Sequence, residues 1–335
     1  MTSSAHTTSI REYTGVIVKD LWRFVPAILA EGNDWLHLCN RRETVSEAPS
    51  GPGVRCNWRW TSPLHAAQVF PFLGKALMRR AFRDYPVRLL PEPVETDGGQ
   101  PEISFIIGHR GVERLPHLLL VLRSLAGQRH NRIECIVVEE SWTPEIADSL
   151  PAWVRYEHIR SSSPDAPYNR SRTFNTGAAL ARSPLLVLHD NDMAVPDTYA
   201  AELLRCRRRE YPVINLKRFI FYLRETHTLR LFLEDTVDFS GRPECVVQNL
   251  TGGGSLAVDR TVFEQLGGMD EGFVGWGGED VEFWDRAQTV RVWNYGHLPL
   301  LHFWHAPQPG KTPDKKSPAM QRLDAVMGDP ATDEP

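Results

Sequence analysis

An alternation of apolar runs and amphipathic segments between residues 103 and 193 constrains the fold more than any other feature of the chain. The apolar runs predict strands at 103–110, 133–141, 153–161 and 184–193. The amphipathic segments between them predict helices at 115–128 and 170–183. Strands that alternate with helices at this spacing indicate right-handed crossovers. We therefore predict a Rossmann-like α/β fold, with a mostly parallel sheet flanked by helices.

The segment before this alternation differs in composition. It is rich in Trp, Arg and Pro, and PEPVETDGGQPE (91–102) is typical of a linker. We predict an N-terminal extension at 1–95, an α/β domain at 100–310 and a mobile tail at 311–335.

Charge and cysteine content exclude several classes of protein. The 38 basic and 42 acidic residues give a formal net charge of −4, so no nucleic-acid partner is expected. The five cysteines show no CxxC spacing, which argues against a disulfide framework and a zinc site. The sequence has neither a signal-peptide pattern nor an apolar run long enough to span a membrane. We therefore expect a cytoplasmic location.

Polar residues follow three of the predicted strands at the point where each strand ends. They are GHR (108–110), EES (139–141) and HDND (189–192). Parallel sheets bind ligands at the carboxyl ends of their strands. We therefore expect Arg110, Glu140 and the HDND acids to contribute to one site.

Two short motifs could hold a divalent cation. Asp190 and Asp192 are separated by one residue, so both side chains can turn toward the exit of their strand. His302 and His305 in LHFWHAP offer imidazoles, which are common ligands of transition metals. The alternatives are acids that begin a turn and histidines that are packed or lie on the surface. The occurrence of both motifs in one chain favours a site for Mn²⁺ or Mg²⁺.

Two further segments suit a phosphorylated or polar ligand. YNRSRTFNTG (168–177) opens a helix whose free N–H groups and Arg170 would favour a diphosphate; the alternative is a solvated basic helix start. In 249–280, Gly253 and Gly254 allow close backbone approach to a ligand. The acids that follow in GWGGED could include a general base, or could cap the helix VEFWDRA.

These motifs occur in the same order in GT-A-fold glycosyltransferases. Residues 103 to about 305 resemble the β-1,4-galactosyltransferase family most closely, through IIGHR, YNRSRTFNTG, VLHDNDMAVP and GWGGED. The resemblance implies a metal-dependent hexosyltransferase that uses a UDP-sugar, with galactose or N-acetylgalactosamine favoured. The acceptor would be a hydroxyl of a glycan or of a lipid-linked carrier.

The resemblance also implies roles for individual donor and metal residues. Arg110 corresponds to a nucleotide-binding arginine and Arg170 to the diphosphate-binding arginine. Asp192 corresponds to the metal-binding aspartate and Asp190 to its partner. His302 and His305 are both candidates for the late metal ligand, and we favour His305. Glu140, Gly253 and Gly254 complete the predicted donor site.

The GWGGED motif implies the acceptor and catalytic residues. Trp276 and Gly277 correspond to the acceptor-binding segment, and Glu279 to an acid that holds the donor or acceptor sugar. Asp280 corresponds to the general base. Related retaining enzymes carry Asn at this last position, so Asp280 predicts inversion of configuration.

The chain departs from the β-1,4-galactosyltransferase family in two regions, and two other functions compete with the one that the family implies. The family's membrane anchor has no counterpart, which suggests a bacterial cytosolic enzyme of polysaccharide biosynthesis. The N-terminal extension could recognise the acceptor, meet an anionic membrane surface at the inner face, or simply cover the catalytic domain, which we favour. The competing functions are a nucleotidyltransferase and a non-catalytic sugar-binding or assembly protein.

Overall fold

The computed structural model describes residues 9–58, 60–94, 99–130, 132–234, 237–275, 277–307 and 318–327. Its α-helices are α1 (Ile10–Lys19), α2 (Leu21–Leu29), α3 (His65–Val69), α4 (Pro71–Asp84), α5 (Leu115–Ala126), α6 (Arg170–Leu180), α7 (Tyr199–Arg207), α8 (Glu225–Leu231), α9 (Arg260–Gln265), α10 (Glu279–Ala287) and α11 (Pro318–Met327). Short 3₁₀ helices are η1 (Asp34–His37), η2 (Val112–Arg114) and η3 (Ala147–Ser149). Within these ranges, no helix is both long and apolar enough to cross a bilayer.

The strands form two larger sheets and one hairpin. The seven-stranded sheet has the order β13 (Val292–Trp293), β9 (Val213–Ile214), β12 (Ser255–Asp259), β7 (Leu185–His189), β4 (Ile103–His109), β5 (Ile133–Ser141) and β6 (Val154–Arg160). The five-stranded sheet has the order β3 (Ser62–Pro63), β11 (Cys245–Gln248), β10 (Lys217–Tyr222), β14 (Leu298–His302) and β8 (Met193–Ala194). The hairpin pairs β1 (Val45–Glu47) with β2 (Val54–Cys56).

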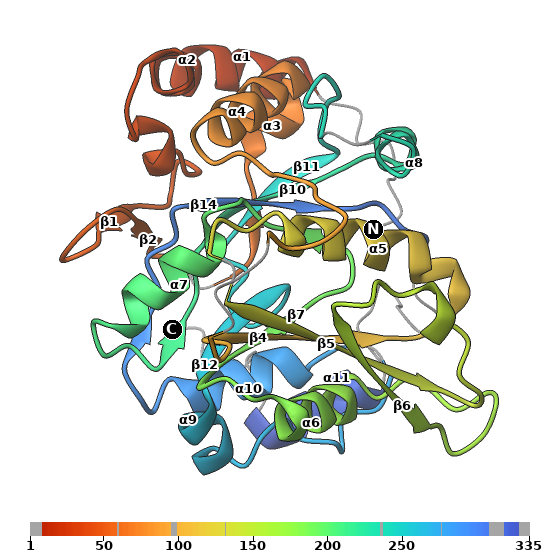
Figure 1. Cartoon of the computed structure of the whole chain (residues 1–335). Helices are drawn as coiled ribbons and strands as arrows, with labels where there is room; N and C mark the ends of the chain where they lie inside the picture. The colour runs from red at the N-terminus through yellow and green to blue at the C-terminus, as the bar shows by residue number, and fades with distance from the viewer. Residues whose placement is uncertain are drawn as a thin grey trace.

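The larger sheet is mostly parallel, as the alternating pattern predicts. β7, β4, β5 and β6 run parallel, and β12 is inserted antiparallel between β7 and β9. Helices α6, α9 and α10 cover one face of this sheet, while α5 and the smaller sheet cover the other (Figure 1). The predicted α/β class is therefore confirmed.

Side-chain alternation along the central strands fills both layers of the core. In β4, Phe105 and Ile107 join the core beneath the smaller sheet, while Ile106 joins the core beneath α6 and α10. Gly177 lets α6 pack tightly, because a Cβ there would lie 2.2 Å from Cγ2 of Ile106. The helix that carries the basic motif is thus fixed directly against the central strand.

The smaller sheet places the histidine motif beside the acidic motif. β8 follows directly after the HDND turn and pairs with β14, so that His302 stands opposite Met193. The sequence pattern gives no indication of this pairing, because the two short strands are more than a hundred residues apart. Residues Asp192 and His302 are neighbours only because this sheet exists.

The N-terminal segment shares the smaller sheet and its core. β3 pairs with β11, and Trp35 packs against Phe219 of β10 with ring centroids 6.1 Å apart. Buried Arg218 donates from Nε to Leu36 O (2.6 Å), from Nη2 to Leu38 O (2.6 Å) and from Nη1 to Gln248 Oε1 (3.0 Å). The proposed boundary near residue 95 lies beside residues 95–98, which are outside the described ranges.

The C-terminal segment contains one described helix. Of the predicted mobile tail, residues 311–317 and 328–335 lie outside the described ranges, and α11 lies between them. Ala319 and Leu323 of α11 pack on Phe273, and Arg322 forms an ion pair with Asp270 at 2.7 Å. This helix therefore rests on the loop that precedes α10.

We predict that Arg218→Leu lowers the free energy of unfolding by roughly 3 kcal/mol, because it leaves three buried oxygens without their donor. Burial already lowers the pKa of Arg218 to about 10, in keeping with its enclosed position. Chemical denaturation monitored by circular dichroism measures the effect. Exposed Arg83→Leu on α4 is the control and should change stability by no more than about 0.5 kcal/mol. Equal stability of the two variants would contradict the prediction.

Candidate active site

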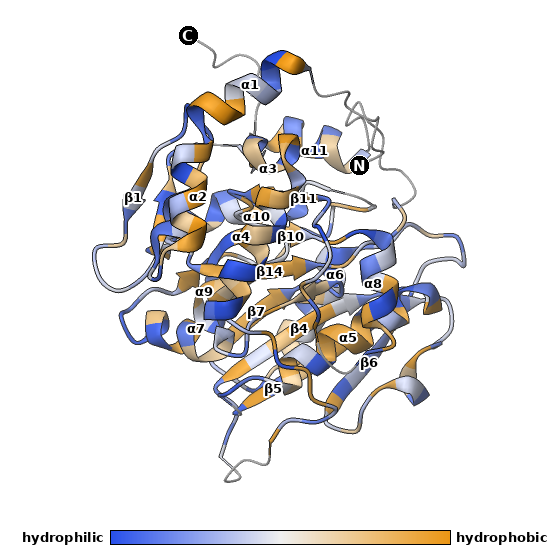
Figure 2. Ribbon diagram, turned by 90° about the horizontal axis from the view of Figure 1, so that it is seen from above, coloured by the Kyte–Doolittle hydropathy of each residue, from blue (hydrophilic) through white to orange (hydrophobic). Residues whose placement is uncertain are grey.

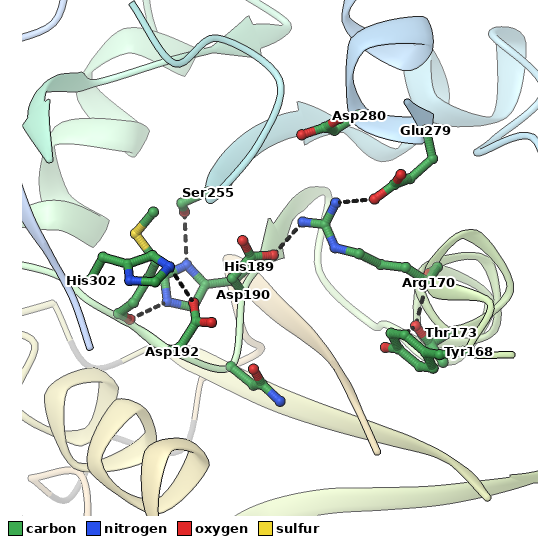
Figure 3. Close-up of polar contacts among 12 residues, drawn as sticks. Tyr168, Arg170, Thr173, His189, Asp190, Asp192, Ser255, Glu279, Asp280 and His302 are labelled. Atoms are coloured by element: carbon green, nitrogen blue, oxygen red, sulfur yellow. Dashed lines mark hydrogen bonds and ion pairs between the residues drawn. The ribbon is translucent and has the colours of Figure 1, made fainter. Parts of the chain in front are cut away.

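Arg170 joins carboxylates from two separate elements. It is the first residue of α6, and its guanidinium donates from Nη1 to Glu279 Oε1 at 2.8 Å and from Nη2 to Asp190 Oδ1 (Figure 3). Asp190 follows the end of β7, and Glu279 is the first residue of α10. Arg170 thus connects the end of β7 with the start of α10. We call Arg170, Asp190, Glu279 and Asp280 the acid cluster.

The charges in the acid cluster depend on one another. Burial alone would lower the pKa of Arg170, but Asp190, Glu279 and Asp280 raise it above its usual value. Burial raises the pKa of Asp190 and of Glu279, and Arg170 opposes both shifts. Glu279 Oε2 is buried with no hydrogen-bond partner among the described residues. That oxygen is available to accept a hydrogen bond from a ligand hydroxyl.

Asp280 packs against the glycine loop, residues 251–254. A Cβ on Gly252 would lie 2.1 Å from Asp280 O, and a Cβ on Gly253 would lie 2.5 Å from Asp280 Oδ2. Gly254 has φ +84° and accepts from Asp190 N at 2.9 Å. In this structure the two glycines predicted to bind the donor, Gly253 and Gly254, make room for Asp280 and Met193. Contact of Gly253 and Gly254 with a donor stays a prediction.

Asp192, His302 and His305 form a second cluster, which we call the metal triad. Their ligating atoms all lie within 4.8 Å of one another. His305 Nε2 lies 3.4 Å from Asp192 Oδ2, and His302 Nε2 lies 3.8 Å from Asp192 Oδ1. The His302 ring stacks on Tyr222, with centroids 4.2 Å apart. Both predicted histidines therefore face the same carboxylate.

The protonation of the triad suits a divalent cation. His305 Nδ1 lies 2.7 Å from Ala306 O, so this nitrogen donates and Nε2 carries the lone pair in the neutral ring. Burial lowers the pKa of His305, which favours that neutral form. Burial would raise the pKa of Asp192, but His302, Arg114 and His305 hold it well below its usual range. Asp192 Oδ1 has no hydrogen-bond partner among the described residues. One carboxylate and two imidazoles suit a transition cation such as Mn²⁺ better than Mg²⁺, which prefers oxygen ligands.

Arg114 also belongs to the site, although no motif in the sequence marks it. Its Nη2 donates to Asp192 Oδ2 at 2.5 Å and to Asn191 Oδ1 at 3.2 Å. Its Nη1 is buried without a hydrogen-bond partner in the described part of the chain. GHRGVER contains two arginines, Arg110 and Arg114. The one that faces the HDND turn is Arg114, in η2.

A buried hydrogen-bond chain fixes the HDND turn from behind. His189 Nε2 lies 2.9 Å from Met193 O and must donate to it, so Nδ1 accepts from Ser255 Oγ at 2.8 Å. Ser255 Oγ can in turn accept from Tyr199 OH, also at 2.8 Å. Burial lowers the pKa of His189 to about 4 and keeps the ring neutral. The chain ties β7 to β12 and holds Asp190 and Asp192 in place, a role that the sequence did not reveal.

Arg110 and Glu140 make contacts within the protein. Arg110 Nε donates to Glu140 O at 2.9 Å, and Nη1 donates to Ala166 O at 2.5 Å. The carboxylate of Glu140 accepts from Asn169 N at 2.6 Å and lies 3.4 Å from Arg172 Nη1. Both residues therefore anchor the loop that leads into α6. Only Arg110 Nη2, buried and unpaired within the described ranges, remains for a ligand.

The segment before α10 is held by α6 and α11. Asn169 Nδ2 donates to Glu271 O at 2.8 Å, and Gly275 N donates to Tyr168 O at 2.9 Å. Gly277 has φ +94°, and a Cβ there would lie 3.2 Å from Met320 Sδ. Trp276, the predicted acceptor residue, lies outside the described residues. Gly277, predicted to bind the acceptor, lies two residues before α10 and beside Met320 of α11.

Comparisons with known proteins agree with part of the resemblance. Residues 243–294 match the family model of the N-terminal domain of galactosyltransferase, a stretch that contains the glycine loop and Asp280. No curated protein matches the sequence significantly. The resemblance to the β-1,4-galactosyltransferase family in particular stays a prediction.

Two solved structures are similar to the chain. GalNAc-T7, solved with UDP, GalNAc and Mn2+, has 14% identity and a TM-score of 0.48, with 69% of this chain and 49% of that chain covered. TarS 1-349 from S. aureus has 11% identity and a TM-score of 0.43, with 60% of each chain covered. The chain thus spans less than two thirds of either structure.

We predict effects of different size for two neighbouring glycine substitutions. Gly252→Ala meets the backbone of α10 and should lower the free energy of unfolding by about 1–3 kcal/mol. Gly253→Ala meets only the movable carboxylate of Asp280, so its effect should stay below about 1 kcal/mol. Chemical denaturation of both variants measures the difference. A larger loss in Gly253→Ala than in Gly252→Ala would show that the loop packs differently.

Proposed function

We propose that this chain is a metal-dependent glycosyltransferase that moves a hexose from a UDP-sugar to an acceptor hydroxyl with inversion. The observation that carries the proposal is the bridge from Arg170 to Asp190 and Glu279, placed beside Asp280 and the metal triad. The match of residues 243–294, which include Glu279 and Asp280, to a galactosyltransferase family model supports it. Galactose or N-acetylgalactosamine is the proposed donor sugar, and a glycan or lipid-linked carrier is the proposed acceptor.

In the proposed mechanism, three residues of the acid cluster have separate roles. Asp280 would accept the proton of the acceptor hydroxyl while that oxygen attacks the anomeric carbon. The bond from the anomeric carbon to the diphosphate breaks on the opposite face, and UDP leaves with the bonding electrons. Arg170 would stabilise the negative charge that develops on the diphosphate. Glu279 would accept a hydrogen bond from a sugar hydroxyl through Oε2, which has no partner within the described ranges.

The metal triad would contribute charge at the same point. Asp192, His305 and His302 would hold Mn²⁺ or Mg²⁺, which supplies positive charge for the leaving diphosphate. Arg114 would keep Asp192 ionised and oriented before the cation binds. We favour His305 as the histidine ligand, because its hydrogen bond to Ala306 leaves Nε2 facing the carboxylate.

A nucleotidyltransferase fits these contacts less well. Such an enzyme needs a basic phosphate-binding loop after its first strand. The arginines after β4 are Arg110 and Arg114, and both donate mainly to protein oxygens. The acids at the start of α10 would have no role in that reaction. A non-catalytic sugar-binding protein would bind the donor but show no transfer or hydrolysis.

We predict that one UDP-sugar raises the melting temperature of the protein, and only when Mn²⁺ or Mg²⁺ is present. A ligand that binds the folded state at one hundred times its Kd stabilises by about 2.7 kcal/mol, a shift that thermal unfolding readily detects. A panel of nucleotide sugars with and without metal makes the measurement. The shift should disappear in Asp192→Ala and persist in Asp197→Ala, a control outside the triad. Absence of a shift with every nucleotide sugar would refute the donor assignment.

We predict that Asp280→Asn reduces kcat on the order of 10²- to 10⁴-fold and leaves the donor-induced melting shift intact, because Asn cannot accept the acceptor proton. Release of UDP in the presence of acceptor measures the rate. Asp285→Asn, an exposed aspartate on the same helix, is the matched control and should retain wild-type kcat. Near-wild-type transfer by a folded Asp280→Asn variant would rule out Asp280 as the base.

A further inference from the structure

The first two helices carry apolar side chains on their solvent-facing sides. On α1 these are Ile10, Ile17 and Val18, with exposed fractions of 84%, 52% and 65%. On α2 they are Trp22, Val25 and Leu29, with exposed fractions of 68%, 40% and 75%. The intervals of three, four, seven and eight residues place each set on one helix face. We call these six residues the α1–α2 stripe.

The opposite faces of α1 and α2 pack against the rest of the protein. Val16 of α1 and Phe24 and Ala27 of α2 are buried in the main core. The stripe is therefore a second apolar face rather than a displaced core face. α1 and α2 lie at the edge of the molecule, beyond the smaller sheet (Figures 1 and 2). Six exposed large apolar side chains on two consecutive helices are typical of a contact surface.

The charge around the stripe favours an anionic partner. Residues 1–95 carry 12 basic and 9 acidic residues, a net charge of +3, whereas the remaining 26 basic and 33 acidic residues give −7. Within α1 and α2 the basic residues are Arg11, Lys19 and Arg23.

Two acidic side chains lie in or between these helices, and both have local partners. Asp20 forms an ion pair with Arg41 at 2.6 Å, and Glu12 accepts from Ser9 in the capping box of α1. Because Arg41 compensates the charge of Asp20, the three basic residues of α1 and α2 outnumber Glu12, the one acid within these helices.

We propose that the α1–α2 stripe docks the protein on the surface of an anionic lipid bilayer. Short amphipathic helices with an aromatic residue and flanking Lys or Arg lie in the headgroup region, where the apolar face is buried and the cations contact lipid phosphates. Trp22 is suited to this region, because its ring is apolar and its N–H can reach water or headgroups. Docking does not depend on the catalytic assignment; if both hold, a lipid-linked acceptor would be presented at the same surface.

The test is cosedimentation of the full chain with vesicles. Vesicles of phosphatidylcholine mixed with phosphatidylglycerol should retain the protein, and vesicles of phosphatidylcholine alone should retain much less. Ile17→Ser with Trp22→Ser and Leu29→Ser should lower the partition coefficient by more than about tenfold. The matched control is Leu229→Ser with Leu233→Ser, two exposed leucines on and after α8, which should leave binding unchanged.

A second pair of variants keeps the test valid if the triple variant is unstable. Arg11→Gln and Lys19→Gln leave the apolar residues in place, and each should lower binding to the anionic vesicles about fivefold. Raising the salt concentration should also lower binding to the anionic vesicles. Failure of the wild-type chain to bind anionic vesicles would overturn the proposal. Light scattering that shows a dimer, abolished by the triple variant, would also overturn it by assigning the stripe to a second copy of the chain.

Discussion

The contact on which the site depends is the double ion pair of Arg170. Four carboxylates, Asp190, Asp192, Glu279 and Asp280, converge near the end of β7, and their mutual repulsion would separate the strand from α10. The guanidinium connects one carboxylate of the strand with one of the helix, and α6 is itself packed against β4 through Gly177. The geometry of the site is therefore set by a helix that is fixed to the central sheet, and a cation or a charged ligand enters an environment that is already organised.

The sequence predicted the central layer well because its signal is local. The apolar runs that predict β4, β5, β6 and β7 are each bounded by polar residues, and the structure places these strands within a few residues of the predicted limits. The single predicted strand at 184–193 is divided by the HDND turn into β7 and β8, which belong to different sheets. That division cannot be inferred from local pattern, because it depends on pairing with β14 near the end of the chain.

The candidate site was predictable to the extent that its residues stand in recognisable motifs. Arg170, Asp190, Asp192, Glu279 and both histidines come together as the motif order suggested. Arg114 and His189 were missed, because an arginine in a short turn and a histidine inside an apolar strand have no distinctive spacing. The run Gly252-Gly253-Gly254 predicts a backbone that another group can approach closely, because glycine has no Cβ. The structure shows such a close approach. In the structure the approaching group is Asp280, which periodicity alone could not identify.

The order of strands in the smaller sheet has a consequence for how the protein is made. β3 lies at one edge, and β14 lies between β10 and β8, so the sheet combines residues near 62 with residues near 302. Contacts of such long sequence separation form slowly, and during synthesis the earlier strands must wait for β14 to leave the ribosome. The strand that arrives last carries His302 and leads into His305. A nascent chain therefore cannot complete the smaller sheet or the metal triad until residues 298–305 have emerged.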